Sequence, residues 1–564
     1  MMAIAQGKER VRLASLSAHA LSVAHLRALV VLLLLGFTVL VMIARLFYLG
    51  VFEEHRVARD TGTLYIPPRA DLVDRNGVPL ARTIPAFAIR VVPDRVIGDK
   101  PQLARQLAEI FPDTSASDFL DKLNRKRPTY LRRRVVPDFA NQVHALGEVG
   151  FEFPRENERF YPQHGLGAHL LGYVNADGKG VMGMERVLND RLVDDGRRAE
   201  PVRLAMDVRV QAALEHELGT AMRAYKAKGA AGIVLDANNG EVVALASLPE
   251  FNPNKISKED IPRQTNDVTY NVYELGSTFK PLTVAAALDA GTVTNLATRY
   301  DATEPLQVGR FRISDDHPQR RYLNVPETLV HSSNIVTARL ADNLGRERME
   351  AMIRSLGFDA PPQIELVERG QPLWPQSWGR ATNMTVAYGH GIAVTPMHLA
   401  SAYAALVNGG IWRPASVRKL NADEVPAGRR VFKAATSARM RQLLRMIVVH
   451  GTGRKADAPG FRIGGKTGSA EKPHEGGYKR SSLVSTFAAA FPMDNPRYVV
   501  VTMLDEPEGT AASSFQRTAG WTAAPVVGRL VPRIGPMLGV VPDDRRDVDI
   551  SELTPLLWSP RDAS

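Results

Sequence analysis

The chain has 564 residues, and its 71 Lys and Arg residues against 60 Asp and Glu give a formal charge of +11. At roughly 100 to 200 residues per domain this length predicts two to four folded units, and an apolar content of 45% excludes a disordered chain. The chain contains no cysteine, so disulfides, thiol catalysis and cysteine-based metal sites are excluded. The basic excess is dilute and forms no stripe with aromatic residues, so we expect no nucleic-acid partner.

An uncharged apolar run occupies residues 28–44 (ALVVLLLLGFTVLVMIA). It is long enough for a helix to span a membrane, and LFYL at 46–49 extends it with interfacial aromatic residues, so the predicted anchor is 28–49. The positive-inside rule places the basic tail 1–27 in the cytoplasm and the rest of the chain outside. A cleaved signal peptide is the alternative, but no small-residue cleavage site follows the run.

Residues 50–205 are rich in Arg and Pro, with strand-like runs in FAIRVVP and YLRRRVVPDF and one helical stretch at 100–110. This pattern predicts an elongated α+β domain. Nothing in it has the pattern of a catalytic site.

Residues 206–542 have longer periodic segments and form the second predicted domain. They begin with a helix at 208–227, followed by two strand-like runs joined by an Asn-Gly turn at Gly240. LVSTFAAAFPMD and RYVVVTMLDEP add strands, while 278–410 is mainly helical, so we expect a sheet flanked by helices. A polar tail at 543–564 carries no pattern that suggests a role.

Ser277 and Lys280 stand three residues apart at the start of a predicted Ala-rich helix in ELGSTFKPLTVAAALDAG. Pro281 is tolerated in a first helical turn, and Gly291 is placed to end the helix. Residues i and i+3 share a helix face, so the Lys280 amine is expected beside the Ser277 hydroxyl. A lysine kept neutral by burial and nearby positive charge can take the hydroxyl proton, which makes the serine a nucleophile.

The SxxK spacing also occurs at Ser416 (SVRK) and Ser469 (SAEK), so the spacing alone decides nothing. Only the copy at Ser277 is followed in order by HSSN, which carries Ser332 and Asn334, and then by GGKTGSA. Ser332 and Asn334 follow PETLVH on a predicted helix, where Ser332 offers a hydroxyl for proton relay and Asn334 an amide to hold Lys280 and the substrate. Gly464, Gly465 and Gly468 of GGKTGSA would let an extended substrate lie close to the backbone. Taken singly, however, HSSN is also typical of the polar surface of a helix, and GGKTGSA of an ordinary glycine-rich loop. The ordered triple of SxxK, SxN and KTG is the signature of penicillin-binding proteins and related β-lactamases.

With these three motifs in this order, the chain resembles the class B penicillin-binding proteins, the monofunctional peptidoglycan D,D-transpeptidases. Segments such as ADLVDRNGVPLA, RFYPQHGLGAHLLGYV, GMERVLNDRL, MDVRVQ and YGHGIAVTP extend the resemblance over most of the chain. It implies an α+β architecture: one N-terminal membrane helix, a pedestal of the dimerisation type, and a transpeptidase domain with an antiparallel sheet between helices. The departures from the family pattern are Ala70, Leu275, His398 and Ser469, which stands where Thr is commoner.

The resemblance implies that Ser277 attacks the carbonyl between two D-alanines of a stem peptide, and that an amine of a second stem peptide resolves the acyl-enzyme. It assigns catalytic roles to Ser277, Lys280, Ser332, Asn334 and Lys466, and substrate binding to Thr467, Gly468 and Ser469. The backbone N–H groups of Ser277 and Ser469 would form the oxyanion hole. Slow deacylation would make β-lactams stable covalent inhibitors. No cofactor is required, and the scattered histidines, including His317 beside Asp315 and Asp316, predict no metal site.

Several other functions fit less well. A β-lactamase needs a carboxylate that activates water, but Glu365 and Glu368 lack the asparagine four residues on that the class A pattern requires. A bifunctional polymerase would need more than the 150 or so residues available before the transpeptidase domain. A sensor or a non-catalytic scaffold is the remaining alternative. Within class B, RLFYLGVFEEHRVAR and PPRADLVDRNG favour the septal type, FtsI or penicillin-binding protein 3, over the elongation type, penicillin-binding protein 2.

The resemblance also implies partners and a location. We expect a single-pass protein of the bacterial inner membrane with a periplasmic catalytic domain. Its partner would be a membrane-embedded glycan polymerase of the FtsW or RodA type, together with other division proteins.

Overall fold

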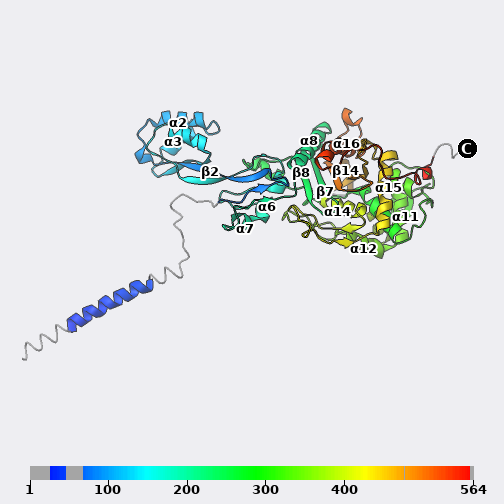
Figure 1. Cartoon of the computed structure of the whole chain (residues 1–564), viewed down its shortest axis with the longest axis horizontal. Helices are drawn as coiled ribbons and strands as arrows, with labels where there is room; N and C mark the ends of the chain where they lie inside the picture. Colours follow the sequence, from blue (N-terminus) through cyan, green and yellow to red (C-terminus); the bar gives the residue numbers. More distant parts are fainter. Residues whose placement is uncertain (1–25, 46–67, 475–476, 559–564) are drawn as a thin grey trace, which may run out of the picture. The chain divides into compact units, whose positions relative to one another are not determined.

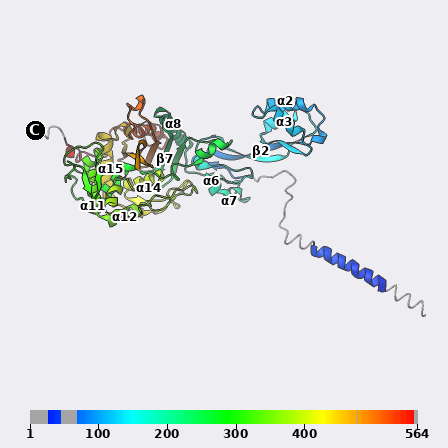
Figure 2. The same cartoon turned by 180° about the vertical axis from the view of Figure 1, so that it is seen from behind.

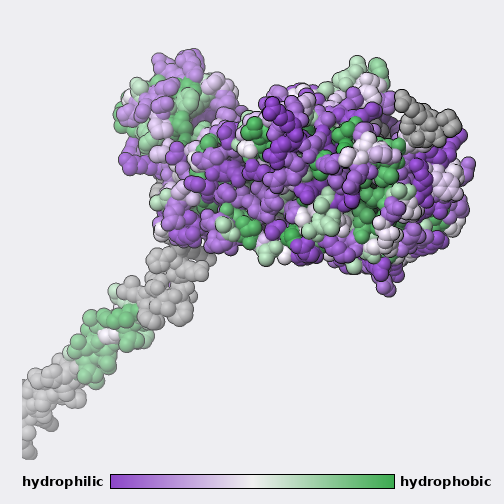
Figure 3. Space-filling model, turned by 45° about the vertical axis from the view of Figure 1, so that its right-hand side comes forward, coloured by the Kyte–Doolittle hydropathy of each residue, from purple (hydrophilic) through white to green (hydrophobic). Residues whose placement is uncertain are grey.

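The computed structural model describes residues 26–45, 68–474 and 477–558. The chain divides into two compact units, Met1–Leu64 and Tyr65–Ser564. In the first unit, helix Leu26–Arg45 spans 20 residues and contains an 18-residue window with a mean hydropathy of 2.7, and its surface is hydrophobic (Figure 3). At 1.5 Å per residue it is about 30 Å long, which matches a bilayer core. The predicted run at 28–44 lies within this helix, whereas the predicted interfacial residues 46–49 lie outside the described residues.

The second unit begins with a sheet in the order β3-β2-β1-β6, with β4 and β5 also paired to β2. The elements of this part are β1 (Leu72–Val73), β2 (Pro79–Val91), η1 (Pro93–Arg95), α2 (Lys100–Ile110), α3 (Ala116–Leu123), β3 (Thr129–Val135), α4 (Pro137–His144), β4 (Phe151–Glu152), β5 (Arg155–Phe160), α5 (Ala168–Leu171), α6 (Gly183–Val187), α7 (Asn189–Val193) and β6 (Val202–Arg203).

The helix predicted at 100–110 is confirmed as α2, which begins where the Asp99 side chain accepts a hydrogen bond from Gln102 N. The expectation of a single helix here was wrong, since α3 and α4 also form and share an apolar core with α2. Figure 1 shows α2 and α3 side by side. In YLRRRVVPDF the strand ends at Val135, because Pro137 lacks an N–H for the ladder and begins α4.

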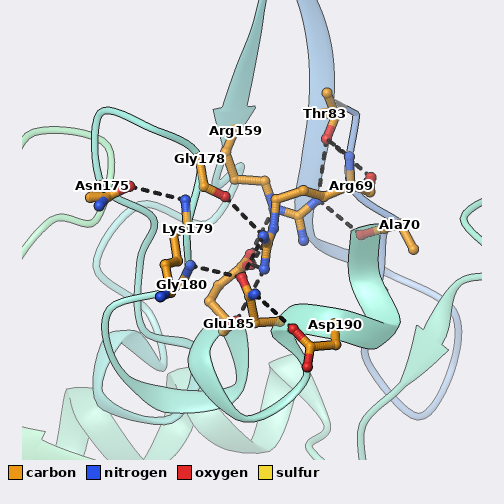
Figure 4. A network of polar contacts seen from close by, with 11 residues as sticks. Arg69, Ala70, Thr83, Arg159, Asn175, Gly178, Lys179, Gly180, Glu185 and Asp190 are labelled. Carbon is orange, nitrogen blue, oxygen red and sulfur yellow. Dashed lines mark hydrogen bonds and ion pairs between the residues drawn. The ribbon is translucent and has the colours of Figure 1, made fainter. Parts of the chain in front are cut away.

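A buried ion network joins three segments of this part (Figure 4). Arg69 Nε donates to Glu185 Oε2 at 3.0 Å, and Arg159 Nε donates to Glu185 Oε1 at 2.7 Å. The three side chains are at most 3% exposed. They come from the chain before β1, from β5 and from α6, so the network fixes these segments together.

The larger part of the second unit is built on an antiparallel sheet in the order β13-β14-β15-β7-β8. Its elements are α8 (Val208–Ala224), β7 (Gly229–Asp236), β8 (Val242–Leu248), η2 (Lys258–Gln264), η3 (Gly276–Phe279), α9 (Lys280–Asp289), β9 (Leu306–Val308), β10 (Phe311–Ile313), α10 (Val325–Val330), α11 (Asn334–Leu344), α12 (Arg346–Ser355), α13 (Arg380–Val386), α14 (Pro396–Val407), β11 (Ile411–Trp412), β12 (Arg429–Arg430), α15 (Ala434–His450), η4 (Arg454–Ala456), β13 (Gly464–His474), β14 (Gly477–Phe491), β15 (Tyr498–Asp505), η5 (Ala511–Ser513), α16 (Ala523–Met537) and η6 (Thr554–Leu556).

Helices cover both faces of this sheet, as predicted. Along β7, Ile233 and Leu235 join the core beneath α14, whereas Val234 joins the core beneath α8 and α16. This alternation follows from the two-residue period of a strand. Figures 1 and 2 show α8 and α14 on opposite sides of β7. The predicted Asn-Gly hairpin is confirmed, since β7 and β8 pair around Gly240, whose φ is +83°.

Candidate active site

The first motif lies where a 3-10 turn enters a helix. Ser277 is in η3, Lys280 begins α9, and the Lys280 N–H donates to the Ser277 carbonyl. Residues i and i+3 eclipse one another in a 3-10 turn, so both side chains leave the same face. Lys280 is fully buried while Ser277 is partly exposed. The predicted helix is confirmed, and it ends before Gly291, whose φ is +71°.

The second motif does not lie on one helix, as had been expected, but between two. Helix α10 ends at Val330, α11 begins at Asn334, and Ser332 between them adopts a φ of +62°. This left-handed conformation is uncommon for a residue with a side chain and produces a sharp turn. The turn carries Ser332 out of the helix surface and into the site.

Two lysines converge on Ser332. Lys280 Nζ donates to Ser332 Oγ at 3.1 Å and also to the Ser332 carbonyl, while Lys466 Nζ donates to Ser332 Oγ at 2.9 Å. These residues lie 52 and 134 positions from Ser332 in the sequence. The structure therefore brings one member of each motif to a single hydroxyl group.

Burial sets the protonation of both lysines. Removal from water disfavours the ammonium and lowers the pKa of Lys280 to about 7, although Asp315 and Asp316 oppose this shift. The pKa of Lys466 is also lowered well below its ordinary value, by burial and by the charge of Lys280. Since like charges disfavour each other, each of the two lysines that share this acceptor disfavours the ammonium form of the other. A neutral amine at Lys280 is able to take a proton.

The third motif lies on β13, the edge strand beside η3. The glycines of this strand were expected to make room for substrate, but this explanation is wrong because protein atoms fill the space. A β-carbon built on Gly464 would meet Met493, one on Gly465 would meet Ala489, and one on Gly468 would lie 2.7 Å from Thr278 Cγ2. The missing side chain at Gly468 instead lets β13 lie directly against the turn that carries Ser277.

The hydroxyls of the third motif are already hydrogen-bonded within the protein. Thr467 Oγ1 lies 2.7 Å from Thr452 Oγ1 and accepts from Lys466 Nζ at 3.3 Å. Ser469 Oγ accepts from the backbone N–H of Ala519 at 2.9 Å. These contacts fix the orientation of both hydroxyl groups along the strand.

Not every predicted contact forms. Asn334 was expected to hold Lys280, but its Nδ2 donates to the carbonyl of Ser314 at 2.9 Å. Among the described residues, the hydrogen bonds of Lys280 Nζ go to Ser332 and none goes to the Ser277 hydroxyl.

The other two SxxK copies are not helical, since Ser416 lies in an isolated β-bridge and Ser469 lies on strand β13. Ser416 Oγ donates to Glu365 Oε1 at 2.6 Å, and the Lys472 of the second copy pairs with Glu506. Glu365 is thus already hydrogen-bonded outside the cluster, and Glu368 accepts from Gly183 N. Neither carboxylate contacts the Ser277 cluster, which agrees with the argument against a lactamase.

Two residues that contact the motifs carry no recognisable functional pattern in the sequence. Thr452 stands in HGTG and contacts Thr467, and only its place before the KTG segment hints at this. Asp315 contacts the turn between α10 and α11, but in the sequence it resembles any polar loop residue. In residues 26–45, 68–474 and 477–558 no group of three His, Asp or Glu side chains is placed to hold a metal ion.

Comparison with known families agrees with this architecture. Residues 230–530 match the penicillin binding protein transpeptidase domain, and residues 65–194 match the penicillin-binding protein dimerisation domain. The first match alone covers more than half of the chain.

Individual relatives extend the match to most of the chain. A probable peptidoglycan D,D-transpeptidase FtsI of Caulobacter vibrioides is 40% identical over 482 residues, covering 84% of this chain and 82% of that protein. The peptidoglycan D,D-transpeptidase FtsI of Escherichia coli is 29% identical over 509 residues, with 84% of each chain covered. Penicillin binding protein 3 of Mycobacterium tuberculosis, solved with aztreonam, has the same fold, with a TM-score of 0.66 at 24% identity over 85% of this chain and 98% of that one. The chain therefore belongs to the class B penicillin-binding proteins, with a dimerisation domain followed by a serine transpeptidase domain.

Proposed function

We propose that the chain crosslinks peptidoglycan at the division septum as a D,D-transpeptidase. The observation that carries this proposal is the convergence of Lys280 and Lys466 on Ser332, beside the turn that carries Ser277. The septal role is supported by the FtsI relatives at 40% and 29% identity.

In the first half-reaction, the Ser277 hydroxyl attacks the carbonyl between the two terminal D-alanines, and Lys280 takes the hydroxyl proton. The C–N bond breaks, and the leaving D-alanine amine receives a proton relayed through Ser332. An ester to Ser277 remains. In the second half, the amine of another stem peptide attacks this ester, loses its proton to Lys280, and releases the Ser277 hydroxyl.

The oxyanion of each tetrahedral intermediate is assigned to the backbone N–H groups of Ser277 and Ser469. The two segments that carry these groups are in close approach, since a β-carbon built on Gly276 would lie 3.2 Å from the Ser469 carbonyl oxygen. Loss of such a donor costs about 3 kcal/mol in other acyl transferases.

Strand β13 is assigned to substrate binding. Lys466, Thr467, Gly468 and Ser469 would hold the terminal carboxylate, and a bound carboxylate would favour the ammonium form of Lys466. Asn334 would orient the stem peptide. β-Lactams present a carboxylate and a reactive carbonyl in the same relation, so they would acylate Ser277.

The location and partners are part of the proposal. The basic tail 1–27 would be cytoplasmic, the anchor 28–49 would cross the inner membrane, and the transpeptidase domain at 206–542 would act in the periplasm after a pedestal at 50–205. Crosslinking consumes new glycan strands, so a membrane polymerase of the FtsW type would supply them.

The test is to incubate the purified full-length chain with a labelled penicillin and to locate the adduct by mass mapping, with Ser277→Ala as the control. A stable adduct on Ser277 that the variant lacks is expected. A folded protein without an adduct, or with one that hydrolyses rapidly, would refute the transpeptidase assignment.

A further inference from the structure

The position of Ser332 is fixed by contacts on both sides of its turn. On the α10 side, the Ser333 N–H donates to the Thr328 carbonyl at 2.9 Å. On the α11 side, Ser333 leads directly into the first turn of α11. Ser332 itself has a left-handed backbone conformation. A conformation that a serine rarely adopts persists only where its neighbours hold it.

Asp315 supplies the contacts on the α11 side. Its Oδ1 accepts from the backbone N–H groups of Asn334 at 2.6 Å and Ile335 at 3.0 Å. Its Oδ2 accepts from the Ser333 hydroxyl at 2.8 Å, and that hydroxyl in turn accepts from Val336 N at 3.2 Å. One carboxylate therefore satisfies two of the free backbone donors in the first turn of α11, where the helix dipole also favours a negative charge.

The carboxylate itself comes from an anchored strand end. Asp315 follows the β9–β10 hairpin, whose Val308 and Ile313 are buried in the main core. The backbones of Tyr300 and Leu323 pair with each other, which holds together the two ends of the segment that carries this hairpin. The same strand end orients Asn334, because the Ser314 carbonyl accepts from Asn334 Nδ2.

We propose that Asp315 is a positioning residue for acyl transfer, which holds the turn so that Ser332 Oγ stays within reach of Lys280 and Lys466. This inference rests on the proposed function. Asp315 does not touch the reacting atoms, and its effect passes through the Ser332–Asn334 backbone.

Asp315 also acts through its charge, which raises the pKa of Lys280 against the effect of burial. The neighbouring Asp316 acts in the same direction but is exposed and makes no hydrogen bond to the turn among the described residues. Asp316→Asn is therefore a matched control that removes a neighbouring carboxylate charge without loosening the turn.

The test measures the rate of Ser277 acylation by a fluorescent penicillin from pH 5 to 9, with the full-length protein and its Asp315→Ala, Asp315→Asn and Asp316→Asn variants. Asp315→Ala removes all three contacts, and a displacement of about 1 Å at a catalytic group costs on the order of 100-fold. The high-pH plateau of Asp315→Ala is therefore expected to fall by about 100-fold.

Asp315→Asn keeps an oxygen that can accept from both backbone N–H groups, so its plateau should lie between those of Asp315→Ala and the wild type. Asp316→Asn should stay within about threefold, since water screens an exposed charge.

A role through charge alone gives a different result. Removal of the carboxylate would then lower the pKa of Lys280, so the midpoint would move to lower pH while the plateau stayed at the wild-type value for all three variants. That outcome overturns the proposal. If Asp315→Ala does not fold, a plateau for Asp315→Asn equal to that of Asp316→Asn overturns it. If the wild type forms no Ser277 adduct, the proposed function fails first.

Discussion

Gly468→Ala tests whether the close approach of β13 to the Ser277 turn is needed for activity. The added β-carbon would lie 2.7 Å from Thr278 Cγ2 and 2.4 Å from the Leu275 carbonyl oxygen. Ordinary contact begins at 3.4 Å, so the closer clash requires the two segments to separate by about 1.0 Å, the difference between 3.4 and 2.4 Å. Thr278 cannot rotate away freely, because its Oγ1 donates to the same carbonyl at 2.9 Å.

A separation of this size moves the backbone N–H groups assigned to the oxyanion hole apart. Since a displacement of about 1 Å costs on the order of 100-fold, acylation should slow by about that factor. Overpacking of this kind should also lower the free energy of unfolding by about 1–3 kcal/mol.

The assay follows the acylation of Ser277 by a fluorescent penicillin, with thermal unfolding measured in parallel. Gly379→Ala is the matched control, because nothing lies within 4 Å of a β-carbon built there and its φ is −81°. The control should acylate at the wild-type rate. A wild-type rate for Gly468→Ala would refute the argument that the glycine is required for this approach.

Three further outcomes are expected. Lys280 must be neutral to act as the base and its pKa is about 7, so the acylation rate should rise through pH 7, reach a plateau above it and fall about tenfold per unit well below it. Glu185→Gln leaves two buried guanidinium groups without their carboxylate and should destabilise the fold by about 3–5 kcal/mol in denaturant unfolding, whereas Asp71→Asn breaks an exposed ion pair and should cost under about 1 kcal/mol. Thr452→Val removes the 2.7 Å contact to the Thr467 hydroxyl, so binding of a β-lactam carboxylate should weaken severalfold, by about 1 kcal/mol. An equal loss in the rate of the acylation step itself would contradict a binding role.

The sequence predictions were confirmed where interactions within a few positions decide the structure, and they failed where contacts between distant segments decide it. The helix at 100–110 and the hairpin at Gly240 rest on capping, periodicity and turn residues within a few positions, and both are confirmed. The helices α3 and α4 were missed because their apolar faces are short and are completed by neighbours from distant segments. Local pattern is insufficient where packing supplies the stabilisation.

The sequence by itself determined the family, the order of the three motifs and which serine has a lysine on the same face of a helical turn. Only the tertiary structure decided the geometry of the site. The left-handed turn at Ser332, the two lysines that share its hydroxyl and the carboxylate of Asp315 that holds it all depend on residues 18 to 134 positions away. Contacts at that separation form only once the chain has paid the entropy of closing the intervening loops, and the packing of the whole domain, not a local motif, decides which groups then meet.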